Sequence, residues 1–286
     1  MRALISLIIA VVASLGGTLL LAYGGGNAVI VMSQVDASGD VGVFPLWAGL
    51  GALLLAVAGA SVRWSSLGAF VAGGAQLGFA LLALLVPAGA DGSGSPAIWL
   101  LDRLLVLDRG LASGAFYLVA FGGSLLIGAA LLGVGVGALR RRPRLGWRIA
   151  SGIGGLLALG AASWSFAAGG EFARIVFQGQ AWEFGVALAV VLAGLSFGVL
   201  LLPSGRSPIG AWVAGGVIAA VGVILLVADP SAYTDAPSRV LLTLPILGWS
   251  GTILAVGLCV LGLALGVTLR PVADAASDEE QPASAM

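Results

Sequence analysis

The stretch "LGAFVAGG", residues 67–74, returns 142 positions later as "IGAWVAGG", residues 209–216. Each copy begins an apolar run just after a short turn that carries one arginine, Arg63 or Arg206. Three more pairs of similar segments follow the same order: "GGNAVIVMSQ" (25–34) with "GGEFARIVFQ" (169–178), "RLLVL" (from Arg103) with "RVLLTL" (from Arg239), and "FGGSLL" (121–126) with "WSGTIL" (249–254). Chance similarity is common in so biased a composition, but four matches in one order favour an internal duplication.

The composition places this chain in a membrane. Apolar residues make up 59% of the 286 residues and charged residues only 9%, which leaves too little polar surface for a soluble domain. The 46 glycines fit this class, because transmembrane helices accept glycine and pack closely through small residues. The 13 basic residues, all arginine, balance 13 acidic residues, so a nucleic-acid partner is not expected.

Eight apolar stretches have about the 20 residues that a bilayer-spanning helix needs. They are residues 3–23, 43–62, 67–87, 111–139, 146–168, 185–202, 209–228 and 246–269. The first could also be a signal peptide, but no small-x-small cleavage site precedes the polar loop, so we predict a helix there.

The arginines predict the orientation, because loops on the cytoplasmic side carry the excess of basic residues. With both termini inside, nine of the 13 arginines are cytoplasmic. They are Arg2, Arg63, Arg140, Arg141, Arg142, Arg144, Arg148, Arg206 and Arg270, which leaves Arg103, Arg109, Arg174 and Arg239 outside. We expect a multi-pass protein of the bacterial plasma membrane with both termini in the cytoplasm.

The predicted fold is an all-α polytopic membrane protein of eight transmembrane helices, arranged as two parallel four-helix repeats. Residues 1–142 form the first repeat and residues 143–270 the second. An even number of helices per repeat gives both the same orientation, with an axis along the membrane normal. Residues 271–286 are polar and acidic and are expected to form a disordered cytoplasmic tail.

Small residues four apart in the repeated phrase predict close helix packing. They are Ala69, Gly73, Gly74 and Gly78 in the first copy and Ala211, Gly215, Gly216 and Ala220 in the second. We expect the third and seventh helices to pack together at or near the axis between the repeats, so that cysteines at positions 73 and 215 would crosslink. "GVGVG", residues 133–137, is interpreted as helix packing rather than as a phosphate-binding loop.

Residues that carry chemistry are scarce in the predicted spans, where no Asp, Glu or Arg lies near the middle. Without a nucleophile and base, we do not expect an enzyme. The chain has no His and a single Cys, Cys259, so no cofactor and no zinc, haem or copper site is expected. Gln76 is the one amide at depth, and its counterpart by simple offset is Ile218. We favour an interhelical hydrogen bond for Gln76 over contact with a ligand.

Charged side chains gather instead in two outer segments, "PAIWLLDRLLVLDRG" (96–110) and "EFARIVFQGQAWEF" (171–184). The first resembles an interfacial helix, and aromatic residues at headgroup depth are usually anchors. The functional alternative is an outward-facing mouth between the repeats, with Gln76 deeper in the path. Its lining would be Asp102, Arg103, Glu171, Arg174 and Glu183.

Two functions remain open on these grounds. The first is transport of a neutral or apolar solute, favoured by the duplication and the glycine-rich spans. The second is a non-catalytic accessory or scaffold subunit that binds a membrane-protein partner through its helices. The lipid bilayer is the expected partner in either case, and a homo-oligomer is compatible with both.

Overall fold

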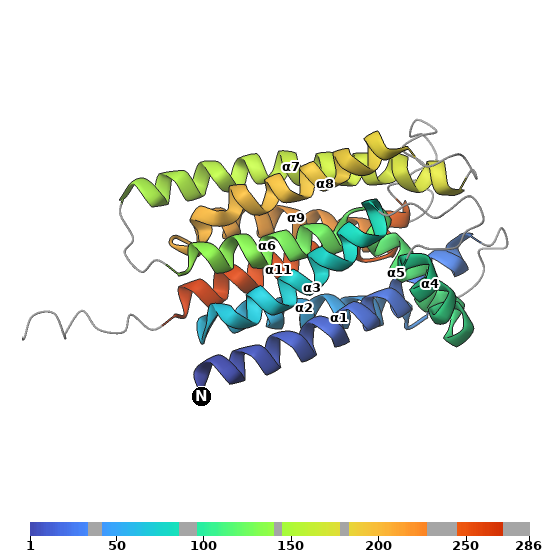
Figure 1. Ribbon diagram of the computed structural model, residues 1–286, viewed down its shortest axis with the longest axis horizontal. Coiled ribbons are helices and arrows are strands. Elements are labelled where there is room, and N and C mark those ends of the chain that lie inside the picture. Colours follow the sequence, from blue (N-terminus) through green and yellow to red (C-terminus); the bar gives the residue numbers. More distant parts are fainter. Residues whose placement is uncertain (34–41, 86–95, 140–144, 178–182, 228–244, 271–286) are drawn as a thin grey trace, which may run out of the picture.

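The computed structural model describes residues 1–33, 42–85, 96–139, 145–177, 183–227 and 245–270, and every regular element in these ranges is a helix (Figure 1). The α-helices are α1 (Arg2–Ser33), α2 (Phe44–Ala60), α3 (Ser66–Leu85), α4 (Pro96–Leu107), α5 (Arg109–Ala120), α6 (Gly123–Gly137), α7 (Leu145–Phe177), α8 (Phe184–Leu201), α9 (Ile209–Val227) and α11 (Thr252–Thr268). Two short 3-10 helices, η1 (Ser61–Arg63) and η2 (Leu202–Gly205), follow α2 and α8, and residues 245–249 form a further helical segment. The predicted tail and the "RRRPR" segment, 140–144, lie outside the described residues.

The long helices run side by side (Figure 1). Large apolar side chains are exposed on their outer surfaces. In each of the six longest apolar helices, only 33% to 44% of the most apolar stretch is buried. Val12, Leu156 and Val199 are 65%, 61% and 67% exposed, respectively. Exposed apolar surface costs about 25 cal/mol per Å² in water, a cost that lipid removes. The bundle is therefore that of an integral membrane protein.

Within the described parts of the chain, six helices are long and apolar enough to cross a bilayer, and a seventh span results if α5 and α6, bent by 58°, count as one. Within the described residues, each of the eight predicted stretches is mostly helical, and turns at residues 121–122 and 250–251 interrupt the fourth and the eighth. The last of them contains α11, which is apolar but has only 17 residues and is preceded by the helical segment 245–249. The number eight therefore stays a prediction.

Arginines stand at the ends of several helices in the described residues, since Arg63 ends η1, Arg206 follows η2 and Arg270 lies two residues after α11. Arg206, which follows η2, stacks 3.6 Å from the ring centroid of Trp147, a cation–π contact. At the same end, Arg270 Nη1 donates to the carbonyl oxygen of Ala138 at 2.7 Å, just after the last turn of α6. Which end faces the cytoplasm stays a prediction.

Glycines bring the two predicted repeats into backbone contact. A Cβ atom at Gly133 of α6 would lie 2.0 Å from the carbonyl oxygen of Gly198 in α8. A Cβ atom at Gly262 of α11 would lie 2.0 Å from the carbonyl oxygen of Ala56 in α2. The last long helix of each predicted repeat thus packs on the second helix of the other. This contact confirms that "GVGVG" is a packing segment.

The prediction that the third and seventh helices pack together is wrong. Over their described lengths α3 packs on α1 and α6, and α9 on α7 and α11. The closest neighbours of Gly73 are in α6, including Gly128, and those of Gly215 are in α11, including Gly257. Small residues permit close approach but do not specify the partner, and here each copy uses them within its own predicted repeat.

The other small residues of the repeated phrase face outward. Nothing lies within 4 Å of a Cβ atom built at Gly74, Gly78 or Gly216, and Ala220 is exposed. The inner positions behave differently, since Ala69 and Ala211 are both fully buried at 0% exposure. Of the eight small residues predicted to pack, four therefore contact neighbouring helices of the chain, and the other four lie on the outer surface of the bundle.

Two left-handed glycines break the chain at similar places, Gly122 before α6 (φ 75°) and Gly251 before α11 (φ 67°). The turns share a hydrogen-bond pattern, because Gly122 N donates to Val119 O and Gly251 N to Gly248 O, each at 2.9 Å. By this geometry Gly122 corresponds to Gly251. The alignment of "FGGSLL" with "WSGTIL" pairs Gly123 with Gly251, one residue away. The sequence does not show which of the two adjacent glycines, Gly122 or Gly123, has the positive φ.

Gly251→Ala is expected to lower the free energy of unfolding by about 1–2 kcal/mol, the cost of a left-handed conformation in a residue with a Cβ atom. Gly122→Ala is expected to cost more, because its methyl group would also lie 2.5 Å from Ser165 Oγ. Gly160→Ala is the control, since nothing lies within 4 Å of its Cβ position. Unfolding midpoints in mixed detergent and SDS measure the effect, and equal stability of all three variants would contradict the two turns.

Candidate ligand cavity

Some polar side chains inside the bundle join neighbouring helices. Gln76 Nε2 of α3 donates to Thr18 Oγ1 at 2.6 Å and to Ser14 Oγ at 3.3 Å, both on α1. This is the interhelical hydrogen bond predicted for Gln76. In membrane helices such a bond is worth about 0.6 kcal/mol on average. Gln76 is 7% exposed, so it acts as a tie between α1 and α3.

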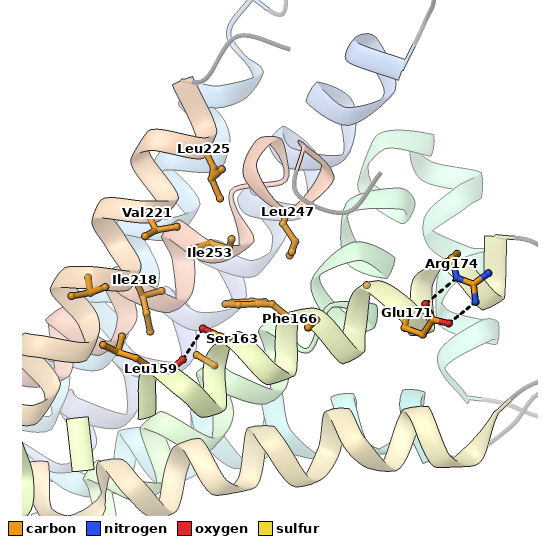
Figure 2. Close-up of a pocket in the computed structure, with 14 residues that line it drawn as sticks. Leu159, Ser163, Phe166, Glu171, Arg174, Ile218, Val221, Leu225, Leu247 and Ile253 are labelled. Atoms are coloured by element: carbon orange, nitrogen blue, oxygen red, sulfur yellow. Dashed lines mark hydrogen bonds and ion pairs between the residues drawn. The ribbon is translucent and has the colours of Figure 1, made fainter. Parts of the chain in front are cut away.

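A cavity of about 550 Å³ lies between α7 and α9, with α11 and the segment 245–249 behind it (Figure 2). The lining residues are Leu159, Ala162, Ser163, Phe166, Ala167, Gly170, Glu171 and Arg174 from α7, Val217, Ile218, Val221 and Leu225 from α9, and Leu247 and Ile253. Its size falls in the range of ordinary small-molecule sites, which are mostly apolar and carry few polar groups.

The interior of the cavity is apolar, and one side is open. Figure 2 shows Phe166 extending from α7 toward Ile218 and Ile253. On the open side, Val217 and Val221 are 47% and 43% exposed. Ser163 on α7 is also exposed, and its hydroxyl group donates to the carbonyl oxygen of Leu159 at 2.9 Å within the same helix. The open side is thus bordered by residues in the middle of two apolar helices.

An ion pair marks the far end of the cavity along α7 (Figure 2). Arg174 Nε donates to Glu171 Oε2 at 2.9 Å, and Arg174 Nη2 donates to Glu171 Oε1. The side chains of Arg174 and Glu171 are 36% and 43% exposed, so the pair contributes little to stability. It places a cationic donor and an anionic acceptor side by side at the rim.

The predicted mouth is only partly assembled. Glu171 and Arg174 line the cavity, but Gln76, Asp102, Arg103 and Glu183 do not. Asp102 and Arg103 are exposed on α4, which packs on α3 and α5, and Glu183 is exposed just before α8. Asp102 and Arg103 do not meet Glu171 and Arg174, because α4 packs on α3 and α5 within the first predicted repeat and α7 belongs to the second. The cavity lies within the second predicted repeat rather than between the two.

The two outer segments also differ from the expectation. Residues 96–110 are not one helix, since Asp108 ends α4 and caps α5, with its Oδ1 accepting a hydrogen bond from Leu111 N at 2.7 Å. Residues 171–177 simply continue α7. Interfacial anchoring therefore stays a prediction for both segments.

The apolar lining was missed by the sequence analysis. Phe166 and Ile253 look like ordinary core residues in a chain that is 59% apolar. The one available signal was Ile218, which stands where the repeated phrase places Gln76 in its first copy. Gln76 joins α3 to α1 by a hydrogen bond, and Ile218 cannot form such a bond between α9 and α7. The equivalent helices of the second predicted repeat are therefore held together differently.

Within the described residues, no group of three or more His, Cys, Asp and Glu side chains could hold a metal ion. The cavity offers dispersion contacts along its length and one donor and acceptor pair at its end, which is an arrangement for binding. No protein-family model matches the chain, and no curated protein or solved structure shows significant similarity to it.

Proposed function

We propose that the protein binds a neutral or apolar solute in the cavity between α7 and α9 and carries it through the membrane. The cavity is the observation that supports this function most directly. Its one charged feature is the Glu171–Arg174 ion pair, which has no net charge. A solute with net charge would lack a counter-ion there, whereas a neutral one can exchange lipid for the apolar lining.

The contact between α7 and α9 is compatible with movement. A Cβ atom at Gly155 would lie 2.4 Å from the carbonyl oxygen of Gly210, so the two helices touch closely near one end. Farther along, the cavity separates them. Gly210 also lies against the backbone of Ser151, and its N–H donates to Ser151 Oγ at 2.9 Å, so this end of the pair is fixed. Tilting of α9 about this fixed end would widen or close the open side.

We further propose the architecture of eight spans in two parallel repeats, with both termini cytoplasmic. Paired contacts between the repeats support it. Gly25 of α1 packs against the backbone of Ser250 before α11, and Gly169 of α7 packs against the backbone of Phe121 before α6. The two contacts are equivalent. Gly25 is matched with Gly169 when "GGN" is aligned with "GGE", and Phe121 is matched with Ser250 when Gly122 is aligned with Gly251. A pseudo-two-fold axis between the repeats accounts for both.

The same correspondence explains why the cavity occurs on one side only. With the offset that relates Gly25 to Gly169, Thr18 corresponds to Ala162. With the offset that relates the two copies of the repeated phrase, Gln76 corresponds to Ile218. The first pair is joined by a hydrogen bond of 2.6 Å, whereas Ala162 and Ile218 both line the cavity. On this interpretation the second repeat lost the polar tie and gained space for a solute.

Val221→Trp is expected to fill the cavity, since Val221 lines it and is 43% exposed, so that a larger side chain can enter without rebuilding the core. After gentle purification from the native membrane, native mass spectrometry should show a bound small molecule, retained about tenfold less by Val221→Trp. Flux of that molecule into proteoliposomes should fall in parallel. Val223→Trp is the matched control, because Val223 lies on the same helix, is 48% exposed and does not line the cavity.

The alternative is an accessory or scaffold subunit, and the outward-facing glycines of α3 favour it. Gly74 and Gly78 have open space where a Cβ atom would lie, so another transmembrane helix could pack closely there. Under this function a membrane protein would co-purify stoichiometrically. Gly78→Leu would then release that protein, and Val221→Trp would have no effect.

A further inference from the structure

The length of α7 gives the depth of the cavity in the bilayer. Arg148 and Arg174 lie 26 residues apart on this helix, about 39 Å at 1.5 Å per residue, which is close to a bilayer with its headgroups. Both guanidinium groups therefore fit at headgroup level. Ser163 lies two residues from their midpoint and so near the centre of the bilayer.

The cavity extends along one leaflet. From Leu159 to Arg174 its lining covers about 22 Å of helix, from near the bilayer centre to the headgroups. The exposed residues of its open side, Ser163, Val217 and Val221, lie at the depth of the hydrocarbon. A molecule that enters there comes from the bilayer and not from water.

From this geometry we infer that the occupant is a zwitterionic phospholipid of that leaflet, with an acyl chain between Phe166, Ile218 and Ile253 and its headgroup on the Glu171–Arg174 ion pair. The inference rests on the proposed function and names the substrate class of the same cavity. The apolar lining matches the chain, and the charged end lies where the headgroup of that leaflet lies.

The ion pair selects the headgroup by charge. The positive charge of Arg174 attracts a phosphate group, and the carboxylate of Glu171 attracts an ammonium group. An anionic headgroup gains the first contact but is repelled by the carboxylate. An uncharged headgroup gains only neutral hydrogen bonds, which are about half as strong. Only a headgroup with both charges complements both partners.

At the corresponding place in the first predicted repeat, the described helices are in contact with one another. Gln76 joins α3 to α1 there, and Gly26 of α1 packs directly on the backbone of Gly110 in α5. One lipid per chain is therefore expected.

Photo-crosslinking in nanodiscs tests the inference. Three probes with the same photoactivatable acyl chain are compared: a phosphatidylethanolamine, a phosphatidylglycerol and a diacylglycerol. The expected result is labelling of residues 159–174 and 217–225 by the phosphatidylethanolamine, about tenfold above the other two. Val221→Trp should remove this labelling and Val223→Trp should not. Size-exclusion chromatography confirms that each variant is folded.

Variants of the ion pair test the headgroup. Arg174→Gln should reduce labelling by the phosphatidylethanolamine to the level of the diacylglycerol. The double variant Glu171→Arg with Arg174→Glu keeps a neutral ion pair and should restore it. Equal labelling by all three probes, unaffected by Arg174→Gln, would overturn the lipid headgroup while leaving an apolar solute site in place. Absence of cavity labelling from a protein that still retains a small molecule would overturn the lipid and not the proposed function.

Discussion

Gly133→Leu and Gly262→Leu, each made alone, are expected to prevent the chain from forming a stable bundle. At both positions a Cβ atom would lie 2.0 Å from a backbone carbonyl oxygen, in α8 and in α2 respectively. Backbone cannot move aside as a flexible side chain can. We expect a loss of about 3 kcal/mol or more in the free energy of unfolding for each variant, the upper range for overpacked sites.

The measurement is the yield of monodisperse protein after detergent extraction, together with the unfolding midpoint of whatever is recovered. Gly160→Leu is the matched control, a glycine of α7 with nothing within 4 Å of its Cβ position. It should be produced like the parent chain. If Gly133→Leu and Gly262→Leu are recovered as well as Gly160→Leu, the α6–α8 and α2–α11 contacts are not those described here.

Neither half of the chain is expected to be a stable folded monomer when produced alone. In residues 1–142, α6 loses α8 and α2 loses α11, which exposes the glycine-lined backbone contacts of both helices. Transmembrane helices associate largely through such packing, so losing two interfaces at once leaves each half incomplete. Co-expression with residues 143–286 should restore the bundle.

An affinity tag on one half and chromatography of the complex measure this reassembly. The tagged half should retain the other half in equal amount and elute at the position of the uncut protein. Gly133→Leu in the first half should abolish the recovery, since it blocks the α6–α8 contact. A single half that elutes alone as a monodisperse, folded monomer would contradict the exchange of contacts between the repeats.

The membrane class and the positions of the helices could be predicted because hydropathy acts locally. An apolar run about as long as a bilayer is thick forms a helix whichever partner it finds, and the described part of each predicted stretch is mostly helical. The hydrogen bond of Gln76 was predictable for a similar reason, since an amide at that depth must find a polar partner.

The sequence did not predict which helices pack on one another. Gly73 and Gly215 were expected to meet each other, and each instead meets the last long helix of its own predicted repeat. Nor did the letters show which of two adjacent glycines, Gly122 or Gly123, adopts the left-handed turn before α6. Small residues indicate that another helix packs closely at that position, but they do not specify which helix it is.

By itself the sequence determined that this is an all-helical membrane chain and where its apolar helices lie. Each of these properties depends on the hydropathy and charge of neighbouring residues. Only the tertiary structure decided that α6 packs on α8, that α11 packs on α2, and that a cavity opens between α7 and α9. A cavity is space left where several helices diverge, so no single residue encodes it, and Phe166, Ile218 and Ile253 acquire their role only through one another.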